Sequence, residues 1–201
     1  MNITIDKPTI LLMFSGGLDS LGCLYLLLTD PQYKDYEIHV HHLIFRNVEN
    51  RDLAETISIK KIFQYLKEHK YREFTYSDGF FAYPAFNKQY GWDMDLYNYM
   101  AGVIAKCTPL IEKVVVGRTK TDMMYSEEVT DRADIANQIF KLLAFSHQEK
   151  VYPVVEFTKR EIYNFLPPDL RVLAWSCRNP RYINGLPVEC GKCKTCTTPW
   201  D

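Results

Sequence analysis

Six residues near the amino end have the composition of an anion-binding turn. The run Ser15-Gly16-Gly17-Leu18-Asp19-Ser20 directly follows the apolar segment Ile10–Phe14. A buried strand that ends in two glycines and then opens a helix leaves backbone N–H groups without acceptors, with the positive end of the helix dipole behind them. The glycines let a pyrophosphate approach these amides and tolerate a positive φ. The segment therefore predicts a phosphate site.

The polar side chains of this run indicate which phosphate compound binds. Ser15 and Ser20 add hydroxyl donors, whereas the Asp19 carboxylate would repel a phosphate unless Mg²⁺ lay between them. We therefore expect ATP with Mg²⁺. The run lacks the ending of a Walker A loop and the glycine spacing of a dinucleotide site. The alternative is a glycine-rich turn without a ligand.

The run resembles the pyrophosphatase loop, Ser-Gly-Gly-x-Asp-Ser, of the PP-loop ATP enzymes. In that superfamily a substrate oxygen attacks the α-phosphate of ATP, the loop holds the departing pyrophosphate, and the product is an adenylate. The resemblance implies nucleotide contacts from Phe14, Ser15, Gly16, Gly17, Leu18, Asp19 and Ser20.

Four cysteines near the carboxyl end have the spacing of a metal site. Cys177, Cys190, Cys193 and Cys196 form C-x12-C-x2-C-x2-C, in which Gly191 gives the turn its flexibility. Four thiolates favour a closed tetrahedral site for one structural Zn²⁺, which would fold a tail with little helix or strand of its own. An iron–sulfur cluster is the alternative, because C-x2-C-x2-C also occurs in ferredoxin-like runs. Cys23 and Cys107 are interpreted as buried apolar residues.

Hydrophobic periodicity predicts alternating strands and helices between the two motifs. We expect strands at 10–14, 37–45, 74–76 and 113–117, and helices over 18–29, 50–69, 94–105 and 135–145. We also expect a mobile polar segment at 120–134 and an extended segment at 152–155 before a capped helix. This alternation predicts a Rossmann-like α/β fold, a parallel sheet with helices on both faces. Because ligands bind beyond the carboxyl ends of such strands, Ser15 and Gly117 should face one pocket.

Bulk composition limits the classes of partner. The 201 residues, 47% of them hydrophobic, are enough for one ATP-binding α/β domain, expected at 1–170, with a small zinc-binding tail at 171–201 packed on it. The net charge of −1 gives no general attraction to nucleic acid or to anionic lipid. No segment has the signature of a signal peptide or a membrane span, so we expect a cytoplasmic protein without a membrane partner.

The two motifs together resemble the 7-cyano-7-deazaguanine (preQ0) synthase family. The knuckle Cys190-Gly191-Lys192-Cys193-Lys194-Thr195-Cys196, with Cys177 upstream, joins the amino-terminal loop in this resemblance. Arg51 and Glu55 match an Arg-His-x-x-Glu stretch of that family, and Gly117 and Asp122 match a Gly-x-n-x-x-Asp segment. Pro153 and Lys159 fall in its Pro and Lys-Glu-Ile region.

This resemblance implies an adenine nucleotide alpha hydrolase-like fold and a specific reaction. The substrates are 7-carboxy-7-deazaguanine, ammonia and ATP, and the nitrile forms through an adenylate and an amide, with release of AMP and pyrophosphate. The resemblance assigns catalytic positions to Asp19, Arg51, Glu55 and Asp122, adds Gly117 to the nucleotide site, and implies a homodimer.

Other functions remain open from the sequence. A PP-loop tRNA thiolation enzyme would explain the loop equally well, although the chain shows no basic RNA-binding extension. Trp92-Asp93-Met94-Asp95 stands where the preQ0 family carries Arg-Asn, which motivates a nucleotide-binding protein with a changed substrate or without turnover. Trp92 is the favoured aromatic residue for stacking on a planar substrate.

Overall fold

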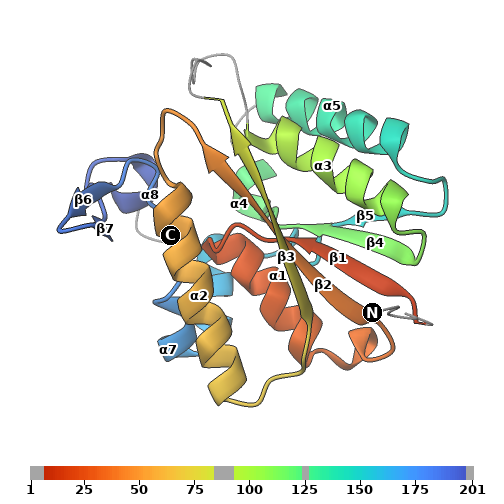
Figure 1. The fold of residues 1–201 in the computed structure, drawn as a ribbon, viewed down its shortest axis with the longest axis horizontal. Coiled ribbons are helices and arrows are strands. Elements are labelled where there is room, and N and C mark those ends of the chain that lie inside the picture. The colour runs from red at the N-terminus through yellow and green to blue at the C-terminus, as the bar shows by residue number, and fades with distance from the viewer. Residues whose placement is uncertain (1–6, 84–92, 124–126, 198–201) are drawn as a thin grey trace.

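The computed structural model describes residues 7–83, 93–123 and 127–197, and only the backbone of 123 and of 127–132. A parallel sheet of five strands forms the centre of this part, in the order β3-β2-β1-β4-β5 (Figure 1). The strands are β1 (Thr9–Met13), β2 (Glu37–Arg46), β3 (Thr75–Ala82), β4 (Ile111–Val116) and β5 (Glu149–Val151). The α/β class predicted from the sequence is confirmed.

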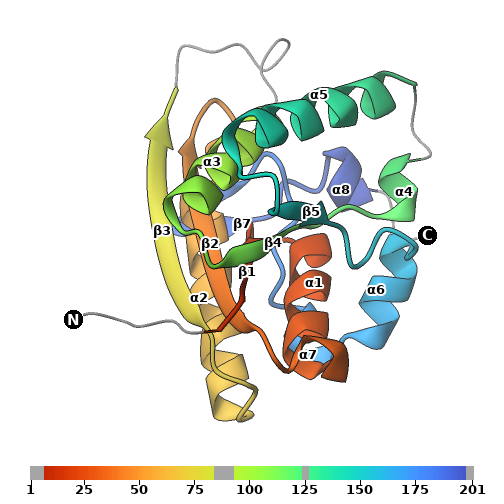
Figure 2. The same cartoon turned by 90° about the vertical axis from the view of Figure 1, so that its right-hand side faces the viewer.

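Helices cover both faces of the sheet, as predicted (Figures 1 and 2). One face carries α1 (Leu18–Thr29), α2 (Asp52–Glu68) and α6 (Lys159–Phe165), and the other carries α3 (Asp93–Cys107) and α5 (Glu127–Leu143). The shorter elements are η1 (Pro31–Tyr33), α4 (Lys120–Met123), α7 (Pro168–Arg171), α8 (Lys194–Thr197) and a hairpin of β6 (Arg181–Ile183) and β7 (Leu186–Val188). None of the described helices is long and apolar enough to cross a membrane.

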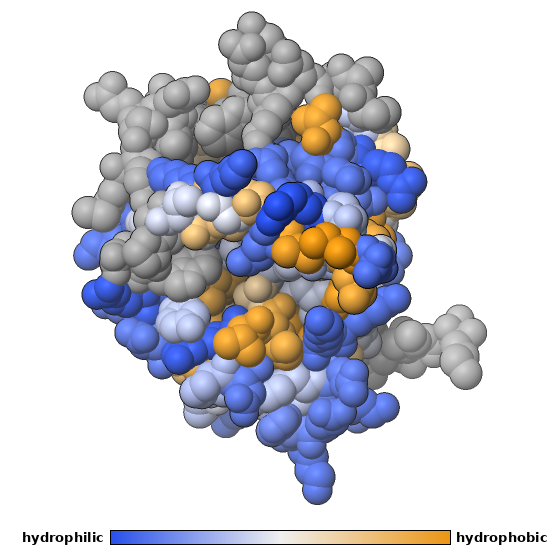
Figure 3. All heavy atoms as spheres, turned by 90° about the vertical axis from the view of Figure 1, so that its left-hand side faces the viewer, coloured by the Kyte–Doolittle hydropathy of each residue, from blue (hydrophilic) through white to orange (hydrophobic). Residues whose placement is uncertain are grey.

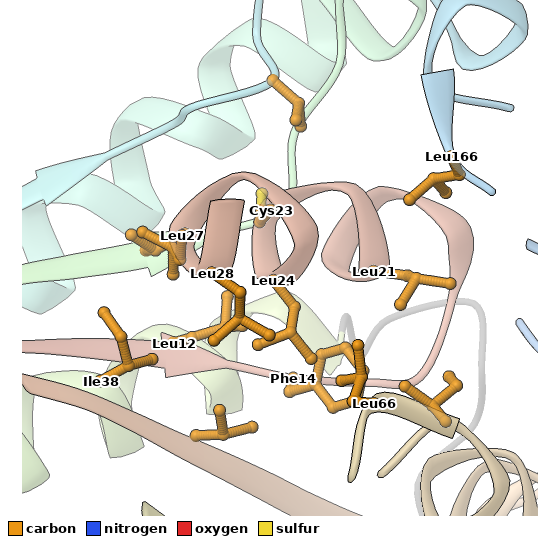
Figure 4. Close-up of a cluster of buried hydrophobic side chains, with 14 of the residues drawn as sticks. Leu12, Phe14, Leu21, Cys23, Leu24, Leu27, Leu28, Ile38, Leu66 and Leu166 are labelled. Carbon is orange, nitrogen blue, oxygen red and sulfur yellow. The ribbon is translucent and has the colours of Figure 1, made fainter. Parts of the chain in front are cut away.

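Strand β1 is the centre of the hydrophobic core, and its side chains alternate between the two faces. Ile10, Leu12 and Phe14 belong to the cluster under α1 and α2, whereas Leu11 and Met13 pack toward α3. Figure 4 shows leucines of α1 directed toward Leu12 and Phe14. Each fully buried side chain of this size stabilises the fold by about 1.5–3 kcal/mol. The core therefore fixes the strand end from which the phosphate loop departs.

Three segments differ from the sequence-based expectation. Strand β3 continues to Ala82 because it pairs with β2 over eight residues, from His39↔Thr75 to Arg46↔Ala82. The segment 120–134, expected to be mobile, contains α4 and the start of α5, which packs Ala136 and Phe140 into the core. The segment expected to be extended at 152–155 forms a turn, in which Val155 N–H donates to the Tyr152 carbonyl at 3.1 Å, and the strand β5 lies before it, at Glu149–Val151.

The carboxyl-terminal tail has more regular structure than expected. Its hairpin turns at Asn184 and Gly185, whose φ values of 52° and 77° both lie in the left-handed region. Asn-Gly at these two positions is the preferred sequence of a two-residue hairpin turn.

The capped helix predicted near residue 158 is confirmed, because Thr158 and Glu161 form a reciprocal capping box at the start of α6.

Candidate functional site

The phosphate loop lies at the switch point of the sheet. Strand β1 pairs with β2 on one side and with β4 on the other, and the chain runs outward to β3 before it returns to β4. Met13 pairs with Val116, so the carboxyl ends of β1 and β4 are level, whereas β2 continues past His41, the partner of Met13, to Arg46. Ligands of open α/β sheets bind at such a crevice. Ser15 and Gly117 therefore border the same pocket, as the sequence predicts.

The amino end of α1 is open for an anion. The helix begins at Leu18 without a side-chain cap, so the first N–H groups have no intrahelical acceptor. Ser15 Oγ lies 3.2 Å from Ser20 Oγ, which places both hydroxyls beside these amides. Gly16 has a φ of 75°, and a Cβ there would lie 2.9 Å from Ile59 Cγ1. This position requires glycine both for its conformation and for space.

Two buried residues fix the strand end that precedes the loop. Phe14 is fully buried and stacks on Phe63 at a centroid distance of 5.8 Å, so only its backbone faces the loop. Its carbonyl oxygen lies 2.8 Å from Nδ1 of His42, a fully buried residue of β2. A neutral His42 that donates from Nδ1 would orient this carbonyl away from the phosphate site.

Gly117 acts through close approach of backbone to backbone. A Cβ at this position would lie 2.8 Å from Ser20 N and 3.0 Å from Asp19 C. The segment after β4 therefore lies directly against the first turn of α1. A side chain at residue 117 would displace the amides that form the anion site.

Lys159 joins two of the predicted carboxylates. Its Nζ lies 2.9 Å from Asp19 Oδ2 and 3.3 Å from Asp122 Oδ1. Burial alone would lower the pKa of Lys159, but both carboxylates raise it, so the ammonium is retained. Burial also raises the pKa of Asp19, against the effect of Lys159. The sequence predicts that Mg²⁺ offsets the negative charge of Asp19. The structure shows that Lys159, 140 residues away in the chain, also contacts this carboxylate.

Arg51 and Glu55 form the centre of a buried charge cluster rather than an exposed helix pair. Arg51 Nη1 donates to Glu55 Oε1 at 2.7 Å, Arg51 Nε lies 2.6 Å from Glu49 Oε2, and Arg51 Nη2 contacts Asp93 Oδ2. Arg178 Nη1 adds a contact of 3.4 Å to Glu49. Three carboxylates thus share two guanidinium groups. Burial, opposed by Arg51, raises the pKa of Glu55 to about 7.

One pocket of about 200 Å³ brings these groups together. It is lined by the loop, by Lys159 and by the Arg51–Glu55 pair, together with residues from α3 and from the tail. The lining includes Ser15, Gly17, Asp19, Ser20, Arg51, Glu55, Met94, Tyr97, Gly117, Lys159, Trp175, Ser176, Arg178 and Thr195. Asp122 does not line this pocket but contacts Lys159, which does. The Asp122 carboxylate accepts hydrogen bonds from Thr119 N–H at 3.1 Å and from Thr119 Oγ1–H at 2.8 Å. Trp92 falls outside the described residues.

The four cysteines of the tail converge as the spacing predicts. Their sulfur atoms all lie within 4.8 Å of one another, and Cys193 and Cys196 are 3.4 Å apart. The amides of Lys192 and Cys193 donate to Cys190 Sγ and lower its pKa, which favours the thiolate that binds a metal. Gly191 has the positive φ, 67°, that this turn needs. The cluster could hold a metal ion or an iron–sulfur centre.

The tail is attached directly to the phosphate loop. Trp175 N–H donates to the Gly16 carbonyl at 2.9 Å, and Trp175 Nε1 donates to the Cys177 carbonyl at 2.9 Å. Thr195 Oγ1 donates to the Ser176 carbonyl at 2.7 Å and lies 3.1 Å from Cys193 Sγ. The segment that carries the four cysteines therefore supplies one wall of the pocket. Figure 3 views the side that bears this tail, where apolar patches interrupt a mostly hydrophilic surface.

The other two cysteines lie in different environments. Cys23 is fully buried in α1, as predicted. The interpretation of Cys107 as a buried residue is wrong, because it is exposed at the last residue of α3, where the helix extends past the core. Neither residue lines the pocket.

Comparisons with known proteins agree with the geometry. No protein-family model and no curated protein matches the chain. The U34-tRNA thiolase NcsA from Methanococcus maripaludis, solved with its 4Fe-4S cluster, is similar in structure, with a TM-score of 0.55 and 14% sequence identity. The match covers 88% of this chain and 61% of that one. The chain has a PP-loop ATP pyrophosphatase-like fold. At this identity the likeness establishes the fold, and the finer resemblance to preQ0 synthases remains a hypothesis.

Gly117→Ala tests the close approach of this residue to the PP-loop. The new Cβ would meet backbone atoms of Asp19 and Ser20, so we expect the affinity for Mg-ATP, measured by calorimetry, to fall by roughly 10²-fold while the fold persists. Gly79→Ala is the matched control, because its Cβ would make only ordinary contacts, the nearest at 3.4 Å. Equal affinities in the two variants would contradict this role for Gly117.

Glu55→Gln tests the buried charge cluster through its pH dependence. A carboxyl whose folded pKa is about 7 destabilises the fold progressively as the pH rises from the pKa of the unfolded chain to 7. Because glutamine cannot ionise, the melting temperature of the variant relative to the wild type should be at least about 3 °C higher at about pH 8 than at about pH 5. The exposed Glu156→Gln variant is the control. A difference independent of pH would show that Glu55 is ionised throughout.

Proposed function

We propose that the chain is an AMP-forming enzyme that uses ATP to activate a substrate oxygen. The observation that carries this proposal is the uncapped amino end of α1 in a pocket that also contains the Lys159 ammonium. Oriented backbone amides and one ammonium suit the charge that develops on a departing pyrophosphate. The PP-loop-like fold supports the same use of ATP.

The residues around the loop have distinct parts in this proposal. The first amides of α1 and the hydroxyls of Ser15 and Ser20 hold the β- and γ-phosphates, and Lys159 neutralises their charge. Asp19 Oδ1 is buried without a hydrogen-bond partner, which suits a carboxylate oxygen that ligates Mg²⁺. Bound Mg²⁺ would neutralise phosphate charge and orient the pyrophosphate for departure.

The reaction consists of two displacements. A substrate oxygen attacks the α-phosphorus, the bond from this phosphorus to the bridging oxygen breaks, and the electron pair leaves with pyrophosphate. A nucleophile then attacks the activated carbon, and AMP leaves with the electron pair of the carbon–oxygen bond. Positioning of the reactants supplies most of the rate, so no side-chain nucleophile is required.

The first acceptor that we propose is a deazaguanine carboxylate, with ammonia as the nucleophile. The two displacements convert the carboxylate to the amide. A second ATP then activates the amide oxygen with release of pyrophosphate, and loss of AMP, which carries that oxygen away, and of the two amide protons gives the nitrile. It is supported by the motif resemblance and by the place of Arg51 and Glu55 in the pocket wall beside Tyr97. Asp93, which stands where the preQ0 family carries a basic region, neutralises Arg51 here. Arg51 and Glu55 would border this substrate on the side of the smaller pocket.

The second acceptor that we propose is a base of tRNA, with sulfur as the nucleophile. The structural likeness to a tRNA thiolase and the cysteine cluster beside the pocket both favour it. Any cysteine that takes part in such a transfer would belong to this cluster, since Cys23 is buried and Cys107 is the last residue of α3. The nature of the metal centre therefore separates the two acceptors.

Sulfur spacing favours zinc in this cluster. Four ligands at about 2.3 Å from one ion lie about 3.8 Å from each other in a tetrahedron. The separations of 3.4 Å for Cys193 and Cys196 and 4.0 Å for Cys190 and Cys196 are close to that value. A cube of four irons would hold its terminal thiolates farther apart. We propose one structural Zn²⁺, bound by all four cysteines.

Product analysis tests the proposed activity. With ATP, Mg²⁺, ammonium and 7-carboxy-7-deazaguanine, the wild type should form AMP, pyrophosphate and the nitrile, as measured by chromatography and mass spectrometry. Lys159→Met should lower the rate by roughly 10²-fold or more, because the ammonium acts on the leaving group, whereas the exposed Lys60→Met control should not.

The alternative outcomes distinguish the rival functions. A colourless protein with one zinc per chain supports the ammonia reaction, whereas visible absorbance after anaerobic purification, with iron and without the nitrile product, supports thiolation. ATP binding without AMP formation from either acceptor would contradict an enzyme and favour a nucleotide-binding scaffold.

A further inference from the structure

A second cavity adjoins the nucleotide pocket and has an excess of positive charge. It has a volume of about 430 Å³ and shares Asp19, Gly117 and Lys159 with the smaller pocket. Its remaining wall includes Arg118, Lys150 and Tyr152, whereas the loop residues Ser15, Gly17 and Ser20 line only the smaller pocket. We propose that Arg118 and Lys150 form an anion subsite that binds a carboxylate or phosphate group of the second substrate. The proposal deepens the adenylation function above and rests on it for the identity of the first ligand.

The two cations come from neighbouring strands and meet at one aromatic ring. Arg118 follows β4, and Lys150 lies in β5 opposite Val114 of β4. Arg118 Cζ is 5.8 Å and Lys150 Nζ is 5.5 Å from the centroid of the Tyr152 ring. The Tyr152 hydroxyl donates to Asn137 Oδ1 at 2.7 Å, which fixes the ring. Both positive groups therefore lie near the same ring in the wall of the cavity.

No carboxylate neutralises this pair within the described residues. The ion pairs of that part of the chain include neither Arg118 nor Lys150. The two carboxylates in the cavity wall, Asp19 and Asp122, are both engaged by Lys159. Two like charges that line the same half-buried cavity wall repel each other, and an anion that binds both would offset that repulsion. Burial, with Arg118 as a second cause, lowers the pKa of Lys150 to about 8.

Lys150 is held in the cavity wall by a buried amide. Asn98 on α3 is fully buried, and its Nδ2 donates to the Met94 carbonyl at 2.6 Å. This hydrogen bond turns Asn98 Oδ1 toward Lys150 Nζ, which contacts it. The ammonium is therefore oriented before any ligand arrives, as expected of a binding group and not of a lysine that extends into solvent.

The position of this subsite suits a second substrate rather than the triphosphate. The open amides of α1 and the serine hydroxyls lie in the smaller pocket, and Lys159 stands between the two cavities. Met94, Ala136 and Tyr152 add apolar wall beside the cations, which suits a flat molecule with one anionic group. An anion bound here would hold its carrier next to Asp19, where the nucleotide is activated.

Calorimetry on the metal-replete protein tests the subsite. The nucleotide site is first filled with Mg²⁺ and α,β-methylene-ATP, in which the bond to be broken cannot react. Two probes are then titrated separately, 7-carboxy-7-deazaguanine for a carboxylate and guanosine 5′-monophosphate for a phosphate. We expect one of them to bind, and Lys150→Met and Arg118→Met each to weaken that probe by about tenfold or more, because a charge-assisted hydrogen bond is lost. The affinity for the nucleotide analogue should change by less than about threefold.

The controls separate this subsite from the proposed function. Lys60→Met, an exposed substitution on α2, should bind both ligands as the wild type does. Unchanged probe affinity in both cavity variants, a parallel loss of analogue affinity, or no probe binding to the wild type would overturn the subsite. If the analogue itself does not bind, the proposed function fails, and titration of the probes without it still decides whether Arg118 and Lys150 bind an anion.

Discussion

The structure depends on a helix that begins without a cap. The first amides of α1 need an acceptor, and the N-cap residue, Gly17, supplies no side chain to them. Phe14 is anchored in the core before the loop, Gly16 turns the chain with a positive φ, and Gly117 brings the neighbouring strand end within backbone contact of Asp19 and Ser20. The burial of β1 thus stabilises a strand end whose polar groups remain available to a ligand.

Two groups of ion pairs lie near this end of α1. Next to the amides, Lys159 contacts both Asp19 and Asp122 and offsets part of their negative charge beside the loop. Farther along the pocket, Arg51 is enclosed by acidic groups. The tail closes the same pocket through Trp175, which donates to the Gly16 carbonyl, so the order of the cysteine cluster and the order of the loop are linked.

The sequence was informative where chemistry depends on local spacing. The turn from β1 into α1 and the convergence of four cysteines both follow from short motifs, and the structure confirms both. The pairing of Lys159 with Asp19 joins residues 140 positions apart, and only the packing of α6 against α1 brings them together. Asp93 could not be found as a partner of Arg51 for the same reason, because 42 positions separate the two residues. The length of β3 also depends on its partner strand, because Gly79 interrupts the local strand pattern.

The central claim is that the first amides of α1 bind the pyrophosphate part of the nucleotide. Titration of isotopically labelled, metal-replete protein with Mg-pyrophosphate, followed by backbone amide NMR, tests it directly. The account predicts saturable shifts that are largest for the amides of Leu18, Asp19 and Ser20. Shifts confined to other basic surfaces of the protein, or no saturable shift at these three amides, would contradict it.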